Sequence, residues 1–234
     1  MWVVRSEPGV VDREAYCLRN GRLERCVDRV VVERAYAVYV NGSRLVSLSC
    51  SPGMEEELAL GFLAGLGFSP SRGYSVSVEG GRVEVRGELE RAPWRRGWGK
   101  FPAEVVVRAV ERLAELGEGF RATGALHGAL CFTPGGEVVG FVEDVSRHCA
   151  VDKCLGLAVK RGLDLGSLGF AVTCRLTGSV VEKFVSASVP LVASKAAVTL
   201  QGVLAAERGG VTLVGFARGG RFNVYTYPKR IALS

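Results

Sequence analysis

Alternating apolar and polar residues mark two strand pairs in the first part of the chain. In residues 27–49, runs rich in valine and tyrosine flank Asn41-Gly42, a dipeptide that accepts positive φ at both central positions of a tight turn. A second alternating stretch, YSVSVEGGRVEVRGEL, surrounds Gly80-Gly81. The pattern therefore predicts two β-hairpins.

Between these hairpins lies SPGMEEELALGFLAGLGF, in which apolar residues recur at helical spacing. Its first residues favour Ser51 as N-cap and Pro52 as the first helical residue, with acidic residues in the first turn. We expect this helix to pack on the first hairpin. Residues 1–90 would then form a small β-rich domain with one helix.

From Phe101 onward, strand and helix patterns alternate. A helix beginning at Pro102 precedes two strands, ALHGALCF and EVVGFVEDV, and the helix SRHCAVDKCLGLAVKRGL; the alternation continues to RFNVYTY. Such alternation is typical of an α/β domain in which helices cover a mixed sheet. We expect this domain over residues 102–234, with residues 91–101 as the linker loop.

Composition is that of a globular protein with an anionic ligand or partner. The 234 residues are 48% hydrophobic, enough for one large domain or two small ones. No apolar run reaches the roughly 18 residues of a membrane-spanning helix, so we expect no membrane association. No secretory signal is visible, which predicts a cytoplasmic location. The net charge of +6 comes mostly from arginine, which suits phosphates.

The spacing of the cysteines and histidines argues against two kinds of site: a disulfide framework and a zinc site. Seven cysteines are scattered without the spacing of a disulfide framework, so most should be small buried residues. Zinc deaminases carry H-x-E followed by P-C-x-x-C, whereas this chain reads His127-Gly128-Ala129 and has no C-x-x-C. We therefore expect neither bound zinc nor deaminase chemistry.

Both histidines fall at predicted strand ends, where open α/β sheets usually bind ligands. His127 lies in TGALHGAL and His148 in EDVSRHCAVDK. A spacing of three to four residues would let Asp144, Arg147 and His148 share one face. The junction is then a polar pocket or, alternatively, a capped helix start with solvated ion pairs; its charged residues are Glu143, Asp144, Arg147, His148, Asp152 and Lys153.

GFARGGRFNVY, near the C-terminus, reads as a strand, a glycine turn and a second strand. Arg218 and Arg221 flank Gly219-Gly220, so backbone N–H groups and two guanidinium groups could approach a phosphate. Asn223 could contact a base or sugar edge. Many hairpin turns of this kind hold no ligand, so the turn alone leaves both interpretations open.

RAPWRRGWGK, residues 91–100, combines four cations and two tryptophans without a clear period. One interpretation is a nucleic-acid arm, with cations on phosphates and indole rings stacked on bases. The other is a mobile surface loop. The rest of the chain offers nucleic acid no further support, so we expect no nucleic-acid partner.

Six segments together resemble the FdhD family of accessory sulfurtransferases for formate dehydrogenase. They occur in this order: SPGMEEELALGFL, TGALHGA, EDVSRHCAVDK, TCRLTGSVVEK, VPLVASKAAVT and LVGFARGGRFNVYT. The resemblance implies a cytidine-deaminase-like three-layer domain without zinc, beside a smaller N-terminal domain, in a homodimer. It also implies that sulfur from a cysteine desulfurase passes, as a persulfide, to the molybdenum of bis-molybdopterin guanine dinucleotide.

The resemblance also assigns guanine dinucleotide binding to residues 216–221, and GDP would mimic this cargo. With the candidates found above and the matched arginine after Cys174, the expected cofactor-binding residues are Phe216, Ala217, Arg218, Gly219, Gly220, Arg221, Asn223, His127, Glu143, Asp144, Arg147, His148 and Arg175.

The chain departs from the family where sulfur should be carried. The family has a C-G-x-C-G-type loop, and alignment on Gly99-Lys100 places Arg95 and Trp98 at its cysteine positions. Neither side chain can form a persulfide. The family shows S-G-R where this chain has Thr173-Cys174-Arg175, so a cysteine stands beside the matched arginine. Beside Arg175 the Cys174 thiolate would be favoured, which makes it a substitute carrier, or it is a buried cysteine at a strand end.

Whether the chain is an enzyme is therefore open. The first function that the sequence predicts is an FdhD-like accessory protein for sulfuration of the cofactor and maturation of formate dehydrogenase. The second is a chaperone that binds the cofactor or a guanine nucleotide without moving sulfur. Nucleic-acid binding through the Arg/Trp loop is a more remote alternative. Ser146 and Ser179 are further departures from the family pattern.

Overall fold

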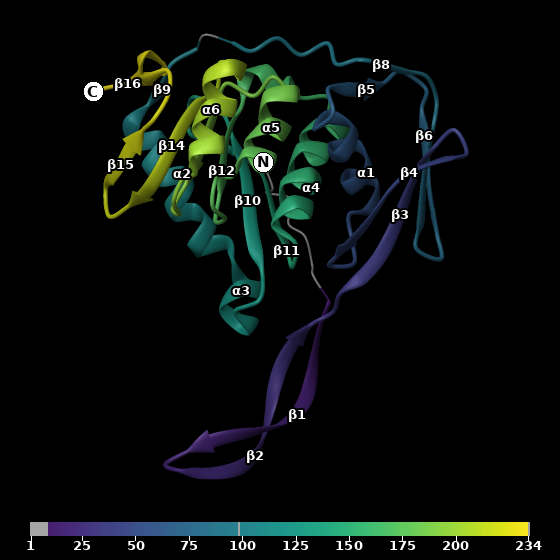
Figure 1. Ribbon diagram of the computed structural model, residues 1–234, viewed down its shortest axis with the longest axis vertical. Coiled ribbons are helices and arrows are strands. Elements are labelled where there is room, and N and C mark those ends of the chain that lie inside the picture. The colour runs from purple at the N-terminus through teal and green to yellow at the C-terminus, as the bar shows by residue number, and fades with distance from the viewer. Residues whose placement is uncertain (1–8, 98, 234) are drawn as a thin grey trace.

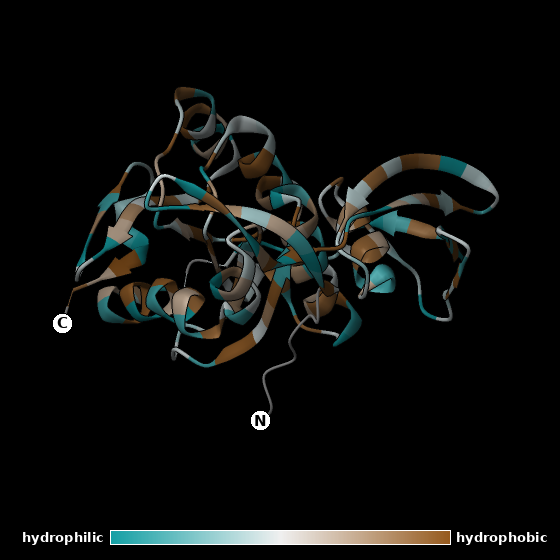
Figure 2. Ribbon diagram, turned by 90° about the horizontal axis from the view of Figure 1, so that it is seen from below, coloured by the Kyte–Doolittle hydropathy of each residue, from teal (hydrophilic) through white to brown (hydrophobic). Residues whose placement is uncertain are grey.

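The computed structural model describes residues 9–97 and 99–233 and has a mixed α/β fold (Figure 1). Hairpins and one helix form the N-terminal part, and a six-stranded sheet flanked by helices forms the rest. Apolar and polar segments alternate along both helices and strands (Figure 2), as expected for elements with one buried face. The predicted fold class is thus confirmed at this level.

The six-stranded sheet has the order β11-β10-β12-β13-β14-β15. Strands β12, β13 and β14 are parallel, and the other neighbours pair antiparallel. The sheet is therefore mixed, as the alternating pattern predicts. Its strands are β10 (His127–Phe132), β11 (Val138–Asp144), β12 (Gly169–Val172), β13 (Leu191–Ser194), β14 (Thr212–Arg218) and β15 (Arg221–Val224).

Helices cover both faces of this sheet. Leu130 and Phe132 of β10 pack with α2 in one apolar cluster, whereas Ala129 and Cys131 pack with α4, α5 and α6 in another. Successive strand residues point to opposite faces, so this split defines three layers. The helices are α2 (Ala103–Leu116), α3 (Glu118–Thr123), α4 (Arg147–Lys160), α5 (Gly178–Ser186) and α6 (Leu200–Gly209), with 3-10 turns η1 (Leu165–Ser167) and η2 (Pro228–Arg230).

The N-terminal part contains both predicted hairpins. They join through β3 and β7 into a four-stranded sheet of order β4-β3-β7-β6. Helix α1 (Glu55–Ala64) packs against this sheet and against α4. The strands here are β3 (Arg34–Val40), β4 (Ser43–Cys50), β6 (Ser75–Glu79) and β7 (Arg82–Arg86), and two short pairs join β5 (Phe68–Pro70) to β8 (Leu89–Arg91) and β9 (Phe101–Pro102) to β16 (Ile231–Ala232).

The predicted start of α1 is wrong by three residues. The helix begins at Glu55 after Met54, which has φ 61°, and Ser51 is not its N-cap. Ser51 is occupied elsewhere: its hydroxyl accepts a hydrogen bond from the backbone N–H of Val145 at 3.1 Å. A long-range contact therefore replaces the local cap that the sequence favours.

The first predicted strand is also assigned differently. Residues 27–31 belong to β2 (Arg22–Val31), which pairs with β1 (Val10–Arg19) in a hairpin of its own. A Cys17–Cys26 disulfide, which the cysteine spacing did not predict, joins these strands. The other five cysteines are free and buried, as expected for most of them. The turn at Asn20-Gly21 carries the same sequence signal as Asn41-Gly42.

Close contact between α1 and α4 joins the two parts of the molecule. A Cβ on Gly61 would lie 1.6 Å from the Asp152 carbonyl oxygen, and one on Gly156 would lie 1.8 Å from the Glu57 carbonyl oxygen. Only glycine permits this approach. The division at residues 90 and 102 stays a prediction. Of the helices in the described part of the chain, none combines the length and apolarity needed to cross a membrane.

Candidate functional site

The sequence motifs converge on one edge of the six-stranded sheet. Strands β12, β13 and β14 are parallel and end there, and the antiparallel β10 begins there with His127 beside Asp144 of β11. We call this the carboxyl edge. Open α/β sheets generally bind ligands outside such an edge, so the topology gives the separated motifs a common location.

A cavity of about 440 Å³ opens at one end of the carboxyl edge. Thr173, after β12, accepts a hydrogen bond on its hydroxyl from the Gly128 N–H at 2.9 Å. Lys195 follows β13, and its ammonium lies 5.5 Å from the centre of the Phe120 ring. The polar lining of the cavity therefore comes from several strand ends and from α3, and comprises Arg121, His127, Glu143, Thr173 and Lys195.

The carboxylates near this edge are bound within the protein. Glu143 accepts hydrogen bonds from the N–H groups of Gly119 and Phe120, both at 2.8 Å, at the start of α3. Asp144 is fully buried, and its carboxylate lies 2.6 Å from the Lys153 ammonium. Asp144 thus faces inward, so its carboxylate is not available to a ligand, and the sharing of one face by Asp144, Arg147 and His148 stays a prediction.

Asp152 is committed in the same way. Its two carboxylate oxygens accept hydrogen bonds from the Lys183 ammonium at 2.7 and 2.9 Å. Burial raises the pKa of Asp152 to about 6, and the Lys183 ammonium opposes that rise. Asp152 and Lys153 therefore hold α4 in place and do not extend a polar pocket.

Positive charge remains at the carboxyl edge once these carboxylates are paired. Arg147 is the first residue of α4, and its Nε is buried without a hydrogen-bond partner among the described residues. Burial, the largest cause, and the Arg147 guanidinium both lower the pKa of His127 and of His148. Arg175 and Lys195 are exposed. This balance of charge favours an anionic ligand.

The arginine-flanked turn lies at the other end of the carboxyl edge. Arg218 and Arg221 pair across the turn and are exposed, and neither guanidinium group has a hydrogen bond or ion pair within residues 9–97 and 99–233. Gly219 and Gly220 have φ 59° and 72°, and no atom would obstruct a Cβ at either position. The turn is therefore open to a ligand.

Residues beside the turn differ in their accessibility. Phe216 has φ 54° at an irregularity in the β14–β15 pairing and is 36% exposed. Asn223 is exposed and pairs with Gly215. Ala217, in contrast, is buried in the core beneath the sheet. Its side chain supports the strand, so only its neighbours can contact a ligand through their side chains.

The cavity and the turn can be spanned by one extended molecule. Three strand spacings separate β10 from β14, which corresponds to roughly 14 Å at about 4.8 Å per spacing. Among the described residues, no group of three His, Cys, Asp or Glu side chains is placed to hold a metal ion. The geometry is suited to a long anionic ligand lying along the carboxyl edge.

Comparison with known proteins identifies the family. The sequence profile of the FdhD/NarQ family matches residues 77–232. The chain belongs to this family. It is 32% identical to the sulfur carrier protein FdhD of Sulfolobus acidocaldarius, over 92% of this chain and 96% of that protein. It is 33% identical to that of Methanothermobacter thermautotrophicus, over 88% and 93%.

A solved structure agrees with this family membership. The crystal structure of a protein described as a formate dehydrogenase accessory protein, from Desulfotalea psychrophila, superimposes with a TM-score of 0.86 at 26% identity. The match covers 96% of this chain and all of that chain. The N-terminal hairpins, the linking loop and the six-stranded sheet are therefore one shared architecture.

The described part of the Arg/Trp loop, residues 91–97, is anchored by Arg96. Its guanidinium donates to the carbonyl oxygens of Val189 at 2.9 Å and Val185 at 2.8 Å, and also to that of Gly209. Trp94 packs against the apolar core, and Arg95 is exposed. Trp98 lies outside the described residues. Since Arg96 is bound internally, this loop has fewer cations for nucleic acid than its sequence suggests.

Cys174 is not activated by its arginine neighbours. Its thiol is buried, and burial raises its pKa to about 11, while Arg147 and Arg175 only partly oppose that rise. The expectation that Arg175 would favour the thiolate is thus wrong in net direction. The alternative reading, a buried cysteine at a strand end, describes Cys174 correctly.

Among the cavity residues that the sequence-based set lacks, Thr173 and Lys195 could have been found from the sequence. Both directly follow buried strands, which is the same signal that singled out His127 and His148. Applying that rule to every predicted strand end would have included them.

Proposed function

We propose that this chain is an accessory protein of formate dehydrogenase that holds the guanine dinucleotide of the molybdenum cofactor along its carboxyl edge. The observation that carries this proposal is the surplus of unpaired cations there, from Arg147 at one end to Arg218 and Arg221 at the other. The cofactor is cargo, which the chain would hold for sulfuration and insertion. The names of the relatives and the family membership support this role.

The side chains divide the work along the edge. Arg218 and Arg221 would each present a planar fork to the diphosphate, while the N–H groups of the open glycine turn approach the same oxygens. Asn223 would contact the base or sugar. At the other end, Arg147 would meet an anionic group of the pterin half, and Lys195, which follows β13, would contact the ligand between the two ends. We also propose a zinc-free, deaminase-like arrangement of the three layers and a homodimer.

A second candidate is a cofactor chaperone that moves no sulfur. It is favoured by the cysteines: the five that are not in the disulfide are all buried, and no described residue of the loop at 91–97 is a cysteine. A persulfide carrier needs an accessible thiolate. In the first candidate a cysteine desulfurase is the sulfur donor, and in the second it has no role.

Calorimetry with GDP tests the shared part of both candidates. Arg218→Ala and Arg221→Ala should each weaken binding by about 1.5–3 kcal/mol through loss of a charged hydrogen bond. Arg22→Ala is the matched control, since Arg22 flanks a turn of the same form, Asn20-Gly21, far along the first hairpin. Unchanged affinity in both turn variants, or an equal loss in the control, would refute binding at this turn.

Isotope transfer separates the two candidates. The purified chain is incubated with a cysteine desulfurase and ³⁵S-labelled cysteine, and persulfide is located by mass spectrometry of alkylated peptides. Label on one of the cysteines would establish a sulfur carrier. Retained GDP affinity without label on any cysteine would establish the chaperone instead.

A further inference from the structure

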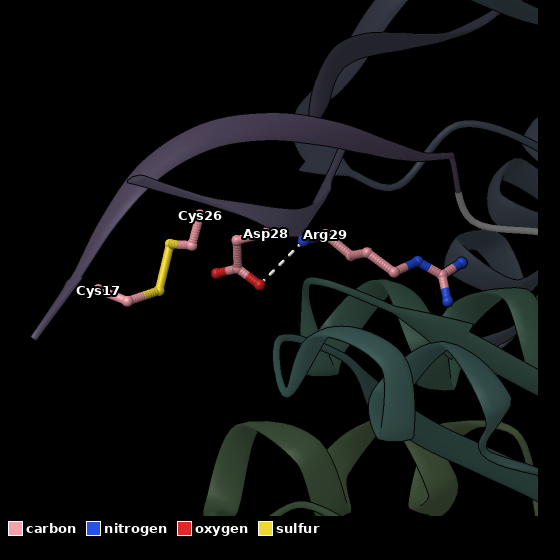
Figure 3. Close-up of a disulfide and its surroundings, with 4 residues drawn as sticks. All are labelled: Cys17, Cys26, Asp28 and Arg29. Carbon is pink, nitrogen blue, oxygen red and sulfur yellow. Dashed lines mark hydrogen bonds between the residues drawn. A yellow bond between two sulfur atoms is a disulfide. The ribbon is translucent and has the colours of Figure 1, made fainter. Parts of the chain in front are cut away.

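The first hairpin projects from the body as an arm. The arm comprises β1 and β2, which form a two-stranded sheet of their own (Figure 1). Two-stranded ribbons are marginally stable in water by themselves. The Cys17–Cys26 disulfide links the strands, as Figure 3 shows, and so stabilises this one covalently. The arm is thus held extended without a layer packed over it.

One face of the arm is an exposed apolar patch. Tyr16, Leu18, Leu23 and Val27 are 66–71% exposed, the highest values for large apolar side chains in strands of the described chain. Leu18 is paired directly with Leu23. Tyr16 lies two residues before Leu18, and Val27 lies four residues after Leu23, so both point to the same face as that pair. Directly opposed residues share a face. We call these four residues the arm patch; the disulfide lies on the opposite face.

Arginines border the arm patch. Arg25 lies opposite Tyr16 on the patch face, whereas Arg19 and Arg22, directly opposed at the turn, lie on the disulfide face. Glu14 lies opposite Val27, at the end of the patch away from the turn. All three arginines are exposed, and none has an ion pair or hydrogen bond in the described part of the molecule. Like charges opposed across a hairpin destabilise it. The turn end of the arm therefore combines exposed apolar side chains with three cations, and it is complementary to an acidic surface that has an apolar centre.

We propose that the arm patch is the docking surface for the formate dehydrogenase apoenzyme, through an acidic surface of that protein. This inference rests on the proposed function for its choice of partner. The arm lies beside the cavity, because β2 contacts α3, and the start of α3 is held by Glu143 of the cavity lining. A client bound to the arm lies next to the cargo that it receives.

Other occupants fit the arm less well. A second copy carries the same +6 charge, and symmetric contact between arm tips brings four arginines together. A lipid bilayer would leave the backbone groups at the two open strand edges unsatisfied, whereas a protein can add a strand there. Nucleic-acid bases stack on aromatic rings, and three of the four patch residues are aliphatic.

Binding to purified formate dehydrogenase apoenzyme of the same organism, measured by biolayer interferometry, tests the proposal. Leu18→Asp/Leu23→Asp should raise Kd at least roughly tenfold. Arg19→Ala/Arg22→Ala should lower the association rate and weaken its salt dependence. Leu45→Asp, at a strand residue that is 43% exposed outside the arm, is the matched control and should bind normally. Unchanged Kd in the arm variants would overturn the proposal.

GDP affinity separates failure of the arm from failure of the proposed function. Arm variants should keep the wild-type GDP affinity, which also confirms that they fold. A wild-type chain that binds GDP but not the apoenzyme would refute the arm alone. A chain that binds neither would refute the proposed function as well.

Two further measurements identify the other occupants. Loss of a dimer in light scattering, with apoenzyme binding retained, would assign the patch to a second copy. Sedimentation with phosphatidylglycerol vesicles that depends on Leu18 and Leu23 would assign it to a membrane, and either result would overturn the proposal. As a second variant, Cys17→Ser/Cys26→Ser keeps the patch but loosens the arm, and it should weaken apoenzyme binding with unchanged GDP affinity.

Discussion

The Asp144 carboxylate and the Lys153 ammonium lie 2.6 Å apart with almost no exposed surface. Lys153 also donates to the Ser51 carbonyl oxygen at 2.7 Å, and Asp144 accepts from the Ser146 N–H at 2.8 Å. The pair thus joins the segment after β4, the end of β11 and α4. A charged group that is buried in this way has lost its hydration. Its stability therefore depends on each of its hydrogen-bond and ion-pair partners.

Removing one partner should therefore be costly. Lys153→Met leaves the Asp144 carboxylate buried without its cation, and we expect a loss of about 3–5 kcal/mol in the free energy of unfolding. Guanidinium chloride unfolding followed by circular dichroism measures it. Lys160→Met, whose ammonium pairs with Glu56 and Glu57 at the surface, is the control and should lose less than about 1 kcal/mol. Equal losses of unfolding free energy in the two variants would show that burial does not make the Asp144–Lys153 pair more costly to break than a surface pair.

The two histidines should make stability depend on pH. Their pKa values are lowered in the folded chain from 6.5, so acid protonates the unfolded chain first. Their contribution to stability is then lost as the pH falls below 6.5. His127→Gln/His148→Gln should lose less stability than wild type between pH 7.5 and 5.5, measured by urea unfolding.

The buried carboxylates act in the opposite direction. The pKa of Asp152 is raised from 3.8 to about 6 in the folded chain. This carboxyl group therefore destabilises the folded state progressively as the pH rises from about 3.8 to about 6. That effect is common to wild type and the histidine variant, so the difference between the two chains isolates the imidazoles. A pH-independent difference would contradict the prediction.

At the scale of elements, the α1–α4 contact depends on two glycines. Cβ atoms at Gly61 and Gly156 would lie 1.6 and 1.8 Å from backbone oxygens of the facing helix. Gly61→Ala or Gly156→Ala should therefore force the helices apart and destabilise the fold by about 3 kcal/mol or more. Thermal unfolding measures this. Gly99→Ala is the control, because a Cβ at this position meets no atom; it should change the free energy of unfolding by less than about 0.5 kcal/mol. An equally small effect of Gly61→Ala would mean that the two helices are not in contact.

The elements that the sequence predicts correctly are those with a clear local signal. Strand and helix alternation after residue 101 and the glycine turns at 41–42 and 80–81 all depend on residues close in sequence. The arm was missed because its strands carry charged residues on both faces, so no buried face produces an alternating pattern. The start of α1 was misplaced because Ser51 binds Val145, 94 residues away.

The choice of site residues stays a prediction, and the sequence shows only part of what places them. Strand ends and the glycine turn are visible in the sequence, and the fold brings them to the carboxyl edge. Burial is not visible: Asp144 and Cys174 have the residue type and spacing of site residues, yet the fold places both inside. A pair such as Asp144–Lys153 can be recognised only when both environments are known.

At the scale of the whole molecule, sheet order determines the length of ligand that the site can hold. The arginine turn and the cavity lie at opposite ends of the carboxyl edge, three strand spacings or roughly 14 Å apart. A short ligand can reach one end only, while a longer one can contact both. Ligand length should therefore decide which substitutions affect binding.

Binding of two guanine ligands to the same variants tests this relation. For GDP, Arg221→Ala should raise Kd at least roughly tenfold, because a charged hydrogen bond to phosphate contributes about 1.5–3 kcal/mol, whereas His127→Ala, at the start of β10, should leave Kd unchanged. For diguanosine tetraphosphate, which is longer and more highly charged, both substitutions should raise Kd. Calorimetry at constant ionic strength removes general screening as a cause. If His127→Ala affects the two ligands equally, the cavity and the turn do not share one ligand, because only an extended molecule that contacts the turn can also reach β10.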